Sequence, residues 1–417
     1  MGKKYFDDSW DFRDSDTKSH THCFHSYPAM MIPQVAGRLL DQYGKNASIL
    51  FDPYCGTGTS LVEANLRGIN AIGTDLNPLA RLIAKSKTTQ IPEKALNVWL
   101  KKFNDLLLLQ DFGKDNGHLN IPRFANIDFW FGKKVQIALA TIKEFIDKIN
   151  DNDIADFFRV AFSETARESS WTKNGEFKLV RMSEEQRLNY APNVFGIMYG
   201  KLTRNKNGLK SFDAAIKNNA YASVLDFNTV EDIPTTYISE KSIDIMITSP
   251  PYGDSRTTVA YGQYSRLSSQ WLGFPNANNV DRLLMGGRPK KLSHNFHNKL
   301  LKEIIDQIAS KDFERAQDVI SFYIDYQKSI KNVARVVKAG GHVCFVVGNR
   351  RVKGISMPTD EITRQFFENE GFEHIETIMR NIPNKRMPSK NSPSNVPGML
   401  DSTMCHEYIV IMKKIEG

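Results

Sequence analysis

Ser249-Pro250-Pro251-Tyr252 is the segment in which residue type and spacing point most directly to chemistry. Two consecutive prolines fix two φ angles and lack two backbone donors, so the neighbouring carbonyl and hydroxyl groups are held rigidly. The hydroxyl of Ser249 and the carbonyl of Pro250 can together accept both protons of an exocyclic amine. The Tyr252 ring offers a face on which a base can stack. These residues predict a site for an amino-bearing base, although a proline-rich turn with a packed tyrosine would have the same sequence.

A second group of residues predicts a loop that binds a nucleoside cofactor. The loop lies between an apolar segment at 48–51 and a helix-compatible segment at 60–66. Its residues are Asp52, Pro53, Tyr54, Cys55, Gly56, Thr57, Gly58 and Thr59. The glycines allow a tight turn and a close approach to a ligand, and the following helix presents unpaired N–H groups.

An acid follows this loop at an informative distance. A strand predicted at 68–75 ends in Asp75, about 20 residues after the glycines, where a doubly wound sheet places a ribose-binding carboxylate. The loop does not match G-x-G-x-x-G, and no Walker lysine follows Gly58. A small nucleoside ligand therefore fits better than a dinucleotide or a nucleoside triphosphate.

Taken in order, the motifs DPYCGTGT, GTDLNP and TSPPY resemble those of the DNA methyltransferases that methylate amino groups with S-adenosyl-L-methionine. The Ser-Pro-Pro-Tyr form is similar to the subgroup that acts on cytosine N4. This resemblance implies an α/β fold, the doubly wound, Rossmann-like sheet of class I methyltransferases. It also implies that the catalytic residues are Ser249, Pro250, Pro251 and Tyr252.

Two further segments extend the resemblance. Residues 25–30, followed by a predicted helix at 33–43, are similar to the element that closes over the methionine end of the cofactor in this family. A strand predicted at 222–225 precedes Asp226, in the position whose acid contacts the adenine amino group in related enzymes. Besides residues 52–59, the implied cofactor contacts are Tyr27, Pro28, Ala29, Asp75, Leu76, Asn77 and Asp226.

The rest of the chain supplies further elements of such a sheet. A helix and a Gly-Gly turn at 333–341 lead to an apolar strand at 342–348, and another helix is predicted at 359–370. An alternating strand at 406–413 would form the antiparallel end of the sheet.

A chain of 417 residues is longer than one hydrophobic core usually supports. We therefore predict a catalytic domain formed by residues 1–91 and 221–417, with a mostly helical insertion at residues 92–220. Amphipathic patterns predict helices in this insertion at 95–109, 133–150 and 154–169.

The downstream half of the insertion is rich in cations and aromatic rings, which is typical of a surface that binds double-stranded DNA. Cationic groups hold phosphates, and planar or amide groups reach base edges. The residues concerned are Arg159, Arg167, Lys173, Lys178, Arg181, Lys201, Arg204, Lys206, Lys210, Trp171, Phe177, Tyr190 and Tyr199. A solvated surface that only completes the fold would have a similar composition. Two basic loops, at 286–299 and 380–397, compete for the same role, and the sequence does not rank them.

Composition restricts the class of protein without deciding it. The 55 Lys and Arg against 47 Asp and Glu give a net charge of +8, which suits a polyanionic partner but is common without one. The four cysteines lie far apart, so we expect no metal site and a reducing compartment. Since the sequence has neither an apolar run of membrane-spanning length nor a hydrophobic signal core, we expect a cytoplasmic protein without a membrane partner. The oligomeric state stays open.

The chemistry of an exocyclic amine indicates how such a site would work. Its lone pair is delocalised into the ring, so attack on the sulfonium methyl needs partial localisation of that pair and an in-line approach. Hydrogen bonds to Ser249 and to the Pro250 carbonyl would promote the attack. The base must be flipped out of the duplex, and Tyr252 would stack on it. Because Ser249 is a weak base, we expect the proton to leave to solvent.

We therefore predict a sequence-specific DNA methyltransferase that acts at cytosine N4, with a separately acting restriction endonuclease as a candidate partner. Adenine N6 is an alternative target, because the same strand-end loop serves both bases in this family. A second alternative is methylation of guanine N2 in tRNA, by enzymes that resemble this core but carry Asp or Asn in place of Ser249. A third is a module that binds the cofactor and nucleic acid without catalysis.

Overall fold

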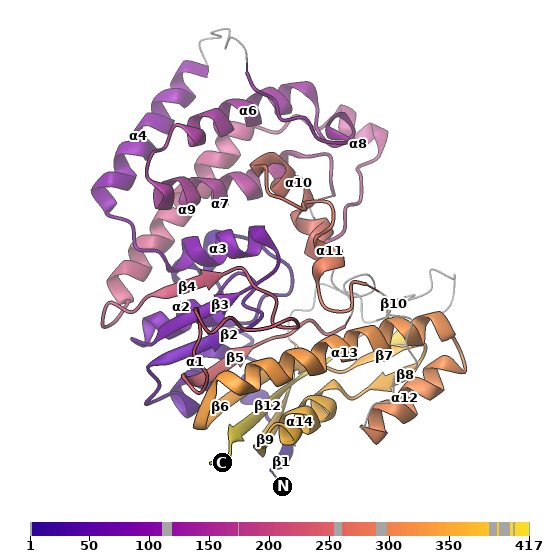
Figure 1. Cartoon of the computed structure of the whole chain (residues 1–417). Helices are drawn as coiled ribbons and strands as arrows, with labels where there is room; N and C mark the ends of the chain where they lie inside the picture. Colours follow the sequence, from indigo (N-terminus) through magenta and orange to yellow (C-terminus); the bar gives the residue numbers. More distant parts are fainter. Residues whose placement is uncertain are drawn as a thin grey trace.

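The computed structural model describes residues 2–110, 119–173, 175–253, 261–288, 298–382, 390–391, 401–402 and 405–416. Its centre is an eight-stranded sheet with helices on both faces (Figure 1). The strands lie in the order β1 (Lys3–Phe6), β9 (Phe372–Asn381), β12 (His406–Lys414), β6 (Val337–Gly348), β5 (Ile243–Thr248), β2 (Ile49–Asp52), β3 (Asn70–Thr74) and β4 (Ala222–Leu225). Neighbouring strands run parallel except for β12, which is antiparallel to both β6 and β9.

The order of the strands reverses beside β2. From β2 the chain moves outward through β3 to β4 at one edge, and then returns to β5 on the other side of β2. The carboxyl ends of β2 and β5 therefore flank a topological switch point, where doubly wound sheets bind their ligands. The α/β, Rossmann-like fold predicted from the sequence is confirmed.

The central strand β5 is buried on both faces for most of its length, which explains its mostly apolar sequence. On β5, Met246 packs in the cluster that includes α13 (Phe313–Val336), whereas Ile245 and Ile247 pack in the cluster that includes α1 (Pro33–Tyr43). This alternation follows from the two-residue period of a strand. The remaining covering helices are α12 (Lys299–Ala309) and α14 (Thr359–Asn369) beside α13, and α2 (Thr59–Leu66) beside α1.

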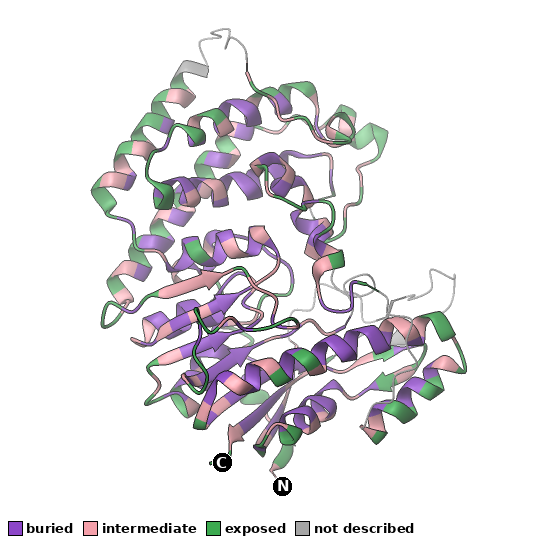
Figure 2. Cartoon of the chain, viewed as in Figure 1, coloured by how far each residue is buried: buried purple, intermediate pink, exposed green. Residues whose placement is uncertain are grey.

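A helical part lies between α3 (Pro78–Thr88) and β4, and it is drawn above the sheet in Figure 1. It contains α4 (Glu93–Gln110), α5 (Ile127–Trp130), α6 (Lys133–Asp147), α7 (Asn152–Ser169), α8 (Glu184–Leu188) and α9 (Val194–Ala215). At its centre is α7, which is buried along most of its length (Figure 2). Phe157 and Phe158 of α7 share one core with Ile83 of α3 and with Trp271 of α10 (Tyr261–Leu272). The helical part is therefore packed directly onto the helix that follows β3.

Shorter elements complete the described chain. They are η1 (Asp8–Trp10), η2 (His20–Phe24), α11 (Val280–Leu283), β7 (Arg350–Val352), β8 (Ile355–Met357), β10 (Lys390–Asn391) and β11 (Asp401–Ser402). None of the described helices combines the length and the apolarity needed to cross a bilayer.

Two predicted elements differ from the structure. The segment at 333–341, expected to form a helix end and a Gly-Gly turn, is helical only to Val336; β6 begins at Val337, and Gly340 (φ +77°) lies within that strand. The register between β5 and β6 shifts there, between Ile243 and Ile245. The final strand, expected to alternate, buries all of the residues from Ile409 to Met412, because both of its faces are covered.

Candidate functional site

A cavity lies at the carboxyl ends of the central strands. Most of the residues predicted to bind the cofactor lie on its wall: 27–29, Asp52, 54–57, Thr59, Asp75 and Asn77. Ser249 and Pro251 line the same cavity. Segments that are far apart in the sequence therefore meet at the switch point.

Other predicted residues do not line the cavity, and some wall residues were not predicted. Those outside the wall are Pro53, Gly58, Leu76, Asp226, Pro250 and Tyr252. Those not predicted are Met30, Met31, Ser60, Tyr261 and Leu284. Met30 and Met31 directly follow the predicted segment, whereas no motif marks Tyr261 or Leu284.

The glycine loop has the conformation that its sequence requires. Gly56 (φ +49°) and Gly58 (φ +77°) both adopt left-handed backbone angles, which favour glycine. A Cβ atom on Gly58 would lie 2.9 Å from Cβ of Ala84 in α3, whereas a Cβ on Gly56 would meet no atom within 4 Å. Gly58 thus lets α2 and α3 approach each other. At Gly56, no side chain occupies the cavity.

Asp75 ties the glycine loop to the end of β3. Its Oδ2 accepts from the Gly56 N–H at 3.1 Å, and its Oδ1 accepts from the Asn77 N–H at 2.7 Å. Burial raises the pKa of this carboxyl. Each oxygen keeps a lone pair, so the group can still accept hydrogen bonds from a ligand in the cavity.

Asp52 is a second buried acid on the wall. It accepts hydrogen bonds from the Thr248 hydroxyl at 2.5 Å, the Tyr54 N–H at 3.1 Å and the Ser60 hydroxyl. Burial raises its pKa to about 6. Two buried carboxyl groups beside an open glycine loop fit a ligand that combines ribose hydroxyls with positive charge, as S-adenosyl-L-methionine does.

Aromatic rings form another side of the cavity. Tyr27 stacks on Tyr261, with ring centroids 6.0 Å apart and planes 15° apart, and its edge meets Tyr264 at 5.4 Å. The Asn77 amide donates to the Tyr27 hydroxyl at 2.7 Å and to Ser265 Oγ at 3.1 Å. The start of α3 and the start of α10 are thereby joined directly, and also through Tyr27.

The tetrapeptide after β5 is connected to the far strands of the sheet. Ser249 Oγ donates to the Tyr252 hydroxyl at 3.1 Å, and this hydroxyl donates to Glu407 Oε1 at 3.1 Å. Glu407 Oε2 accepts from Arg380 Nη1 at 2.7 Å. Burial and the neighbouring Glu407 raise the pKa of Tyr252, so its hydroxyl stays protonated.

Asp226 lies apart from the cavity. Its side chain is 66% exposed and pairs with Arg81 Nη2 at 2.7 Å. Arg81 also donates to the backbone carbonyl of Asp75 at 2.5 Å. Arg81 thus links Asp226 to the backbone of Asp75 at the cavity wall.

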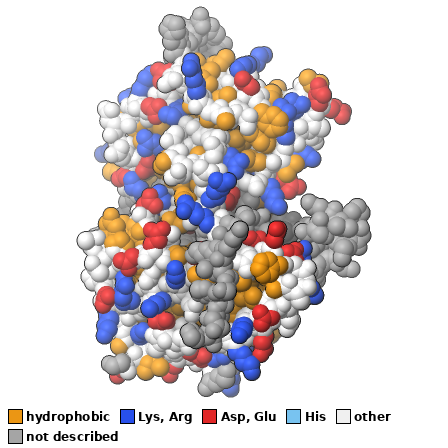
Figure 3. All heavy atoms as spheres, turned by 45° about the vertical axis from the view of Figure 1, so that its right-hand side comes forward, with side chains coloured by type: hydrophobic (Ala, Val, Ile, Leu, Met, Phe, Trp, Pro, Cys, Tyr) orange, Lys and Arg blue, Asp and Glu red, His pale blue; other side chains and the backbone are white. Residues whose placement is uncertain are grey.

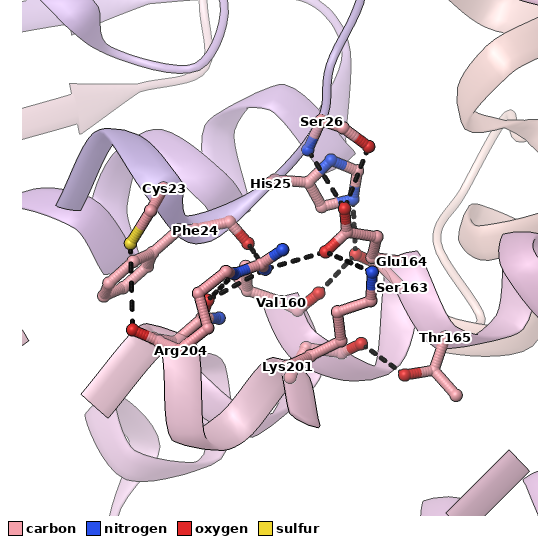
Figure 4. A network of polar contacts seen from close by, with 12 residues as sticks. Cys23, Phe24, His25, Ser26, Val160, Ser163, Glu164, Thr165, Lys201 and Arg204 are labelled. Atoms are coloured by element: carbon pink, nitrogen blue, oxygen red, sulfur yellow. Dashed lines mark hydrogen bonds and ion pairs between the residues drawn. The ribbon is translucent and has the colours of Figure 1, made fainter. Parts of the chain in front are cut away.

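The segment that carries Tyr27 is fixed to the helical part (Figure 4). Glu164 of α7 accepts from Ser26 Oγ at 2.9 Å and from Arg204 of α9 at 2.7 Å. Arg204 also donates to the Phe24 carbonyl at 2.6 Å, and Lys201 lies 3.6 Å from Glu164. Although burial opposes its ionisation, these charges and the nearby His25 lower the pKa of Glu164 to about 2.

This network corrects part of the sequence interpretation. Lys201 and Arg204, expected to hold phosphates, are paired with Glu164 because α7 and α9 pack side by side. Arg167, also expected to face DNA, is buried and donates to the carbonyls of Tyr264 and Glu176 at 3.1 and 2.7 Å. These three cations hold the fold together around the cavity.

The structure describes some of the other candidates for DNA contact and not others. Most of the loops 286–299 and 380–397 lies outside the described residues. Lys173 and Lys178 are exposed, and the Arg181 guanidinium stacks on Phe129 at 3.8 Å from the ring centroid.

Neither a metal nor a reactive thiol is indicated for the cavity. Among the residues that the structure describes, no group of three His, Cys, Asp or Glu side chains could hold a metal ion. Burial raises the pKa of Cys55 well above its ordinary value, which keeps this thiol protonated and unsuited to nucleophilic attack.

The sheet and its cavity define a class I, S-adenosylmethionine-dependent methyltransferase. The strand order, with an antiparallel strand beside an outer parallel pair, places the glycine loop, Asp75 and the Ser-Pro-Pro-Tyr turn at one switch point.

Comparison with known proteins identifies the family. A DNA methylase family model matches residues 1–86. The chain is 39% identical over 423 aligned residues to the type II methyltransferase M.MvaI of Kocuria varians, covering 96% of this chain and 93% of that protein. The chain therefore belongs to the family of DNA methyltransferases of restriction-modification type, whose methyl donor is S-adenosyl-L-methionine.

Two more distant likenesses were found. The chain is 38% identical over 52 residues to a tRNA (guanine(10)-N2)-dimethyltransferase of Methanothermobacter thermautotrophicus, covering 12% of this chain and 16% of that protein. A solved TehB-like SAM-dependent methyltransferase of Corynebacterium glutamicum aligns with a TM-score of 0.29 and 9% identity, covering 91% of this chain and 87% of that one.

Proposed function

We propose that this methyltransferase transfers a methyl group to the N4 amine of a cytosine that is flipped out of duplex DNA. The observation that supports the proposal is that Ser249 lies on the wall of the same cavity as Asp75 and the glycine loop. A base amine held at Ser249 and a nucleoside cofactor held at Asp75 would then meet within one cavity.

For the cofactor, we assign the ribose hydroxyls to Asp75, because an ionised carboxylate accepts strong hydrogen bonds. Asp52 would face the cationic part of the molecule, since a positive charge favours ionisation of a buried carboxyl group. Tyr27, Ala29 and Tyr261 would enclose the ligand. When bound, S-adenosyl-L-methionine supplies an electrophilic methyl group on a positively charged sulfur.

The target amine would be held by Ser249 Oγ and the Pro250 carbonyl, which accept its two protons. Since Ser249 already donates to Tyr252, its hydroxyl acts toward the base as an acceptor. The choice of cytosine rests on family resemblance: members with Ser at this position mostly act on cytosine, and those with Asp or Asn mostly act on adenine.

Mass spectrometry of nucleosides tests the proposal. The purified protein is incubated with labelled cofactor and either genomic duplex DNA or tRNA, and the products are digested. We expect N4-methylcytosine in DNA and no methylated guanosine in tRNA. Methyladenine without methylcytosine would show that the target is adenine N6. A methylated product in tRNA alone would show that the substrate is RNA.

We further propose that the 171–182 loop contacts DNA; its residue 174 lies outside the described part. The loop is closed by hydrogen bonds from Lys173 N to Val180 O and from Met182 N to Trp171 O, both 2.9 Å. It reaches α10 through Phe177, whose ring lies 6.4 Å from that of Tyr264. Because α10 begins at the cavity wall, this contact places the loop beside one of the elements that form the cavity.

The position of the loop agrees with the distribution of charge. In Figure 1, α8, which follows this loop, lies on the same side of the molecule as α10 and α11. Figure 3 brings this side forward and shows Lys and Arg side chains about midway up the face. Phosphate contacts there would set the register of the duplex without reading its sequence.

Charge reversal tests this surface. Lys173→Glu with Lys178→Glu should weaken DNA binding and lower the slope of log K against log salt by about two. Lys94→Glu with Lys101→Glu is the matched control, because these exposed lysines lie on α4, on the opposite side of the helical part. Equal DNA affinity in both double variants would move the contact to the 286–299 or 380–397 loops.

M.MvaI is named a type II methyltransferase, and on that basis we propose a biological role. Methylation would protect cytoplasmic DNA from a separate restriction endonuclease that cuts at the same sequence. Mapping the modified bases in DNA from cells that express the protein would define that sequence.

A further inference from the structure

A chain of hydrogen bonds leads from the predicted methylation site to a carboxylate on another strand. Ser249 and Tyr252 follow β5, whereas Glu407 lies at the start of β12 and Arg380 near the end of β9. The distance from Ser249 Oγ to the Tyr252 hydroxyl and that from the hydroxyl to Glu407 Oε1 are each 3.1 Å. Of these four residues, the Ser-Pro-Pro-Tyr motif contains only Ser249 and Tyr252.

The direction of these hydrogen bonds follows from the chemistry of their ends. An ionised carboxylate only accepts and a guanidinium only donates, so Glu407 accepts from both Arg380 and Tyr252. The Tyr252 oxygen is then free to accept the Ser249 proton. Ser249 Oγ consequently presents lone pairs, and no proton, to the cavity.

We propose that Glu407 is the final acceptor of the proton that the target amine loses. The amino nitrogen forms its bond to the methyl carbon as the carbon–sulfur bond of the donor breaks, with the electron pair remaining on sulfur. The nitrogen then passes a proton to Ser249 Oγ, the Ser249 proton moves to Tyr252, and the Tyr252 proton moves to Glu407. The nitrogen keeps the electron pair of its N–H bond, so charge and protons balance.

This relay rests on the proposed transfer to an exocyclic amine, and it works equally for cytosine N4 and adenine N6. It supplies the base that Ser249 alone does not provide. It also gives the Tyr252 hydroxyl a role distinct from stacking by its ring. The Glu407 side chain is 19% exposed, so the relay ends where the proton can pass to solvent.

Arg380 is the positioning residue of the relay. Its side chain is 2% exposed, and within the described structure its Nε and Nη2 have no hydrogen-bond partner. The positive charge of Arg380 therefore acts mainly on Glu407. In the described part of the chain, Tyr252 from the β5 turn donates to Glu407 and the uncharged Gly348 lies opposite it on β6, while Arg350 lies against Gly253 of the same turn.

Two substitutions distinguish a proton relay from a purely structural role of these side chains in holding the loop. Tyr252→Phe keeps the stacking ring and removes the hydroxyl, and Glu407→Gln keeps the size of the side chain and removes the proton acceptor. We expect each to lower the single-turnover rate of methyl transfer about a hundredfold. The cofactor Kd should stay within twofold, and the double variant should be no slower than either single variant, because the residues act as a unit.

A variant that keeps the carboxylate gives a second test. Glu407→Asp should retain more of the single-turnover rate than Glu407→Gln, because only the first keeps a proton acceptor. Glu373→Gln, at the exposed opposite end of β9, is the control and should behave as wild type.

A wild-type single-turnover rate in Tyr252→Phe or Glu407→Gln would overturn the relay. So would a loss that appears only in cofactor or DNA affinity. Failure of the proposed function looks different, because the wild-type protein itself would then yield no methylated amine in duplex DNA.

Discussion

Asp75→Ala removes the carboxylate that we assign to the ribose of the cofactor. A hydrogen bond to a charged group contributes about 1.5–3 kcal/mol, and loss of one such bond raises Kd about 12- to 150-fold. The substitution also leaves the N–H groups of Gly56 and Asn77 without their acceptor, now at 3.1 and 2.7 Å. Because a loosened glycine loop must be ordered again on binding, we expect a Kd near the upper end of this range.

Isothermal titration calorimetry with S-adenosyl-L-methionine measures this loss. Asp232→Ala is the matched control, because this carboxylate is exposed, pairs with Arg335 and does not line the cavity. Circular dichroism should show that both variants are folded. If folded Asp75→Ala binds the cofactor within threefold of the wild-type Kd, the assignment of the ribose to Asp75 is wrong.

Three other changes have defined outcomes. Asp226→Ala should raise the cofactor Kd less than about threefold by calorimetry, because an exposed ion pair such as that with Arg81 contributes about 0–1 kcal/mol; a tenfold rise would place the adenine beside it. Gly58→Ala should lower the free energy of unfolding by roughly 1–3 kcal/mol in denaturant melts, since φ is +77° and the new Cβ would meet Ala84. The pKa of Glu164 is lowered from 4.5 to about 2, so its ionised form stabilises the fold above about pH 4.5, and this contribution is lost as the pH falls toward 2. Between pH 6 and pH 2 the wild type should lose roughly 3 kcal/mol more stability than Glu164→Gln in denaturant melts, and equal losses would contradict this account.

The cofactor side of the cavity could be predicted from the sequence because its signals are local. The apolar strand, the two glycines and the helix lie within 49–66, and Asp75 follows at the end of the next strand. A turn that needs left-handed backbone angles restricts its own sequence, so Gly56 and Gly58 mark it without reference to the rest of the fold.

The rest of the cavity wall and the proton relay depend on contacts between segments that are far apart in the sequence. Tyr261 and Glu407 carry no local motif, and the tertiary fold alone brings them to the turn after β5. The role of charged residues is equally hard to predict from local sequence. Lys201 and Arg204 belong to a basic stretch in the sequence, but the packing of α9 on α7 places Glu164 beside them.

The network around Glu164 has a consequence for redesign of specificity. The segment that carries Tyr27 is held by side chains of α7 and α9, and its Phe24 ring lies 5.7 Å from that of Phe157. A chimera that exchanges residues 93–215 alone would replace Glu164, which accepts from Ser26 Oγ, and Phe157, which contacts the Phe24 ring. Grafting the helical part from a relative therefore requires residues 20–27 from the same donor, which makes these two separate stretches a single unit of exchange.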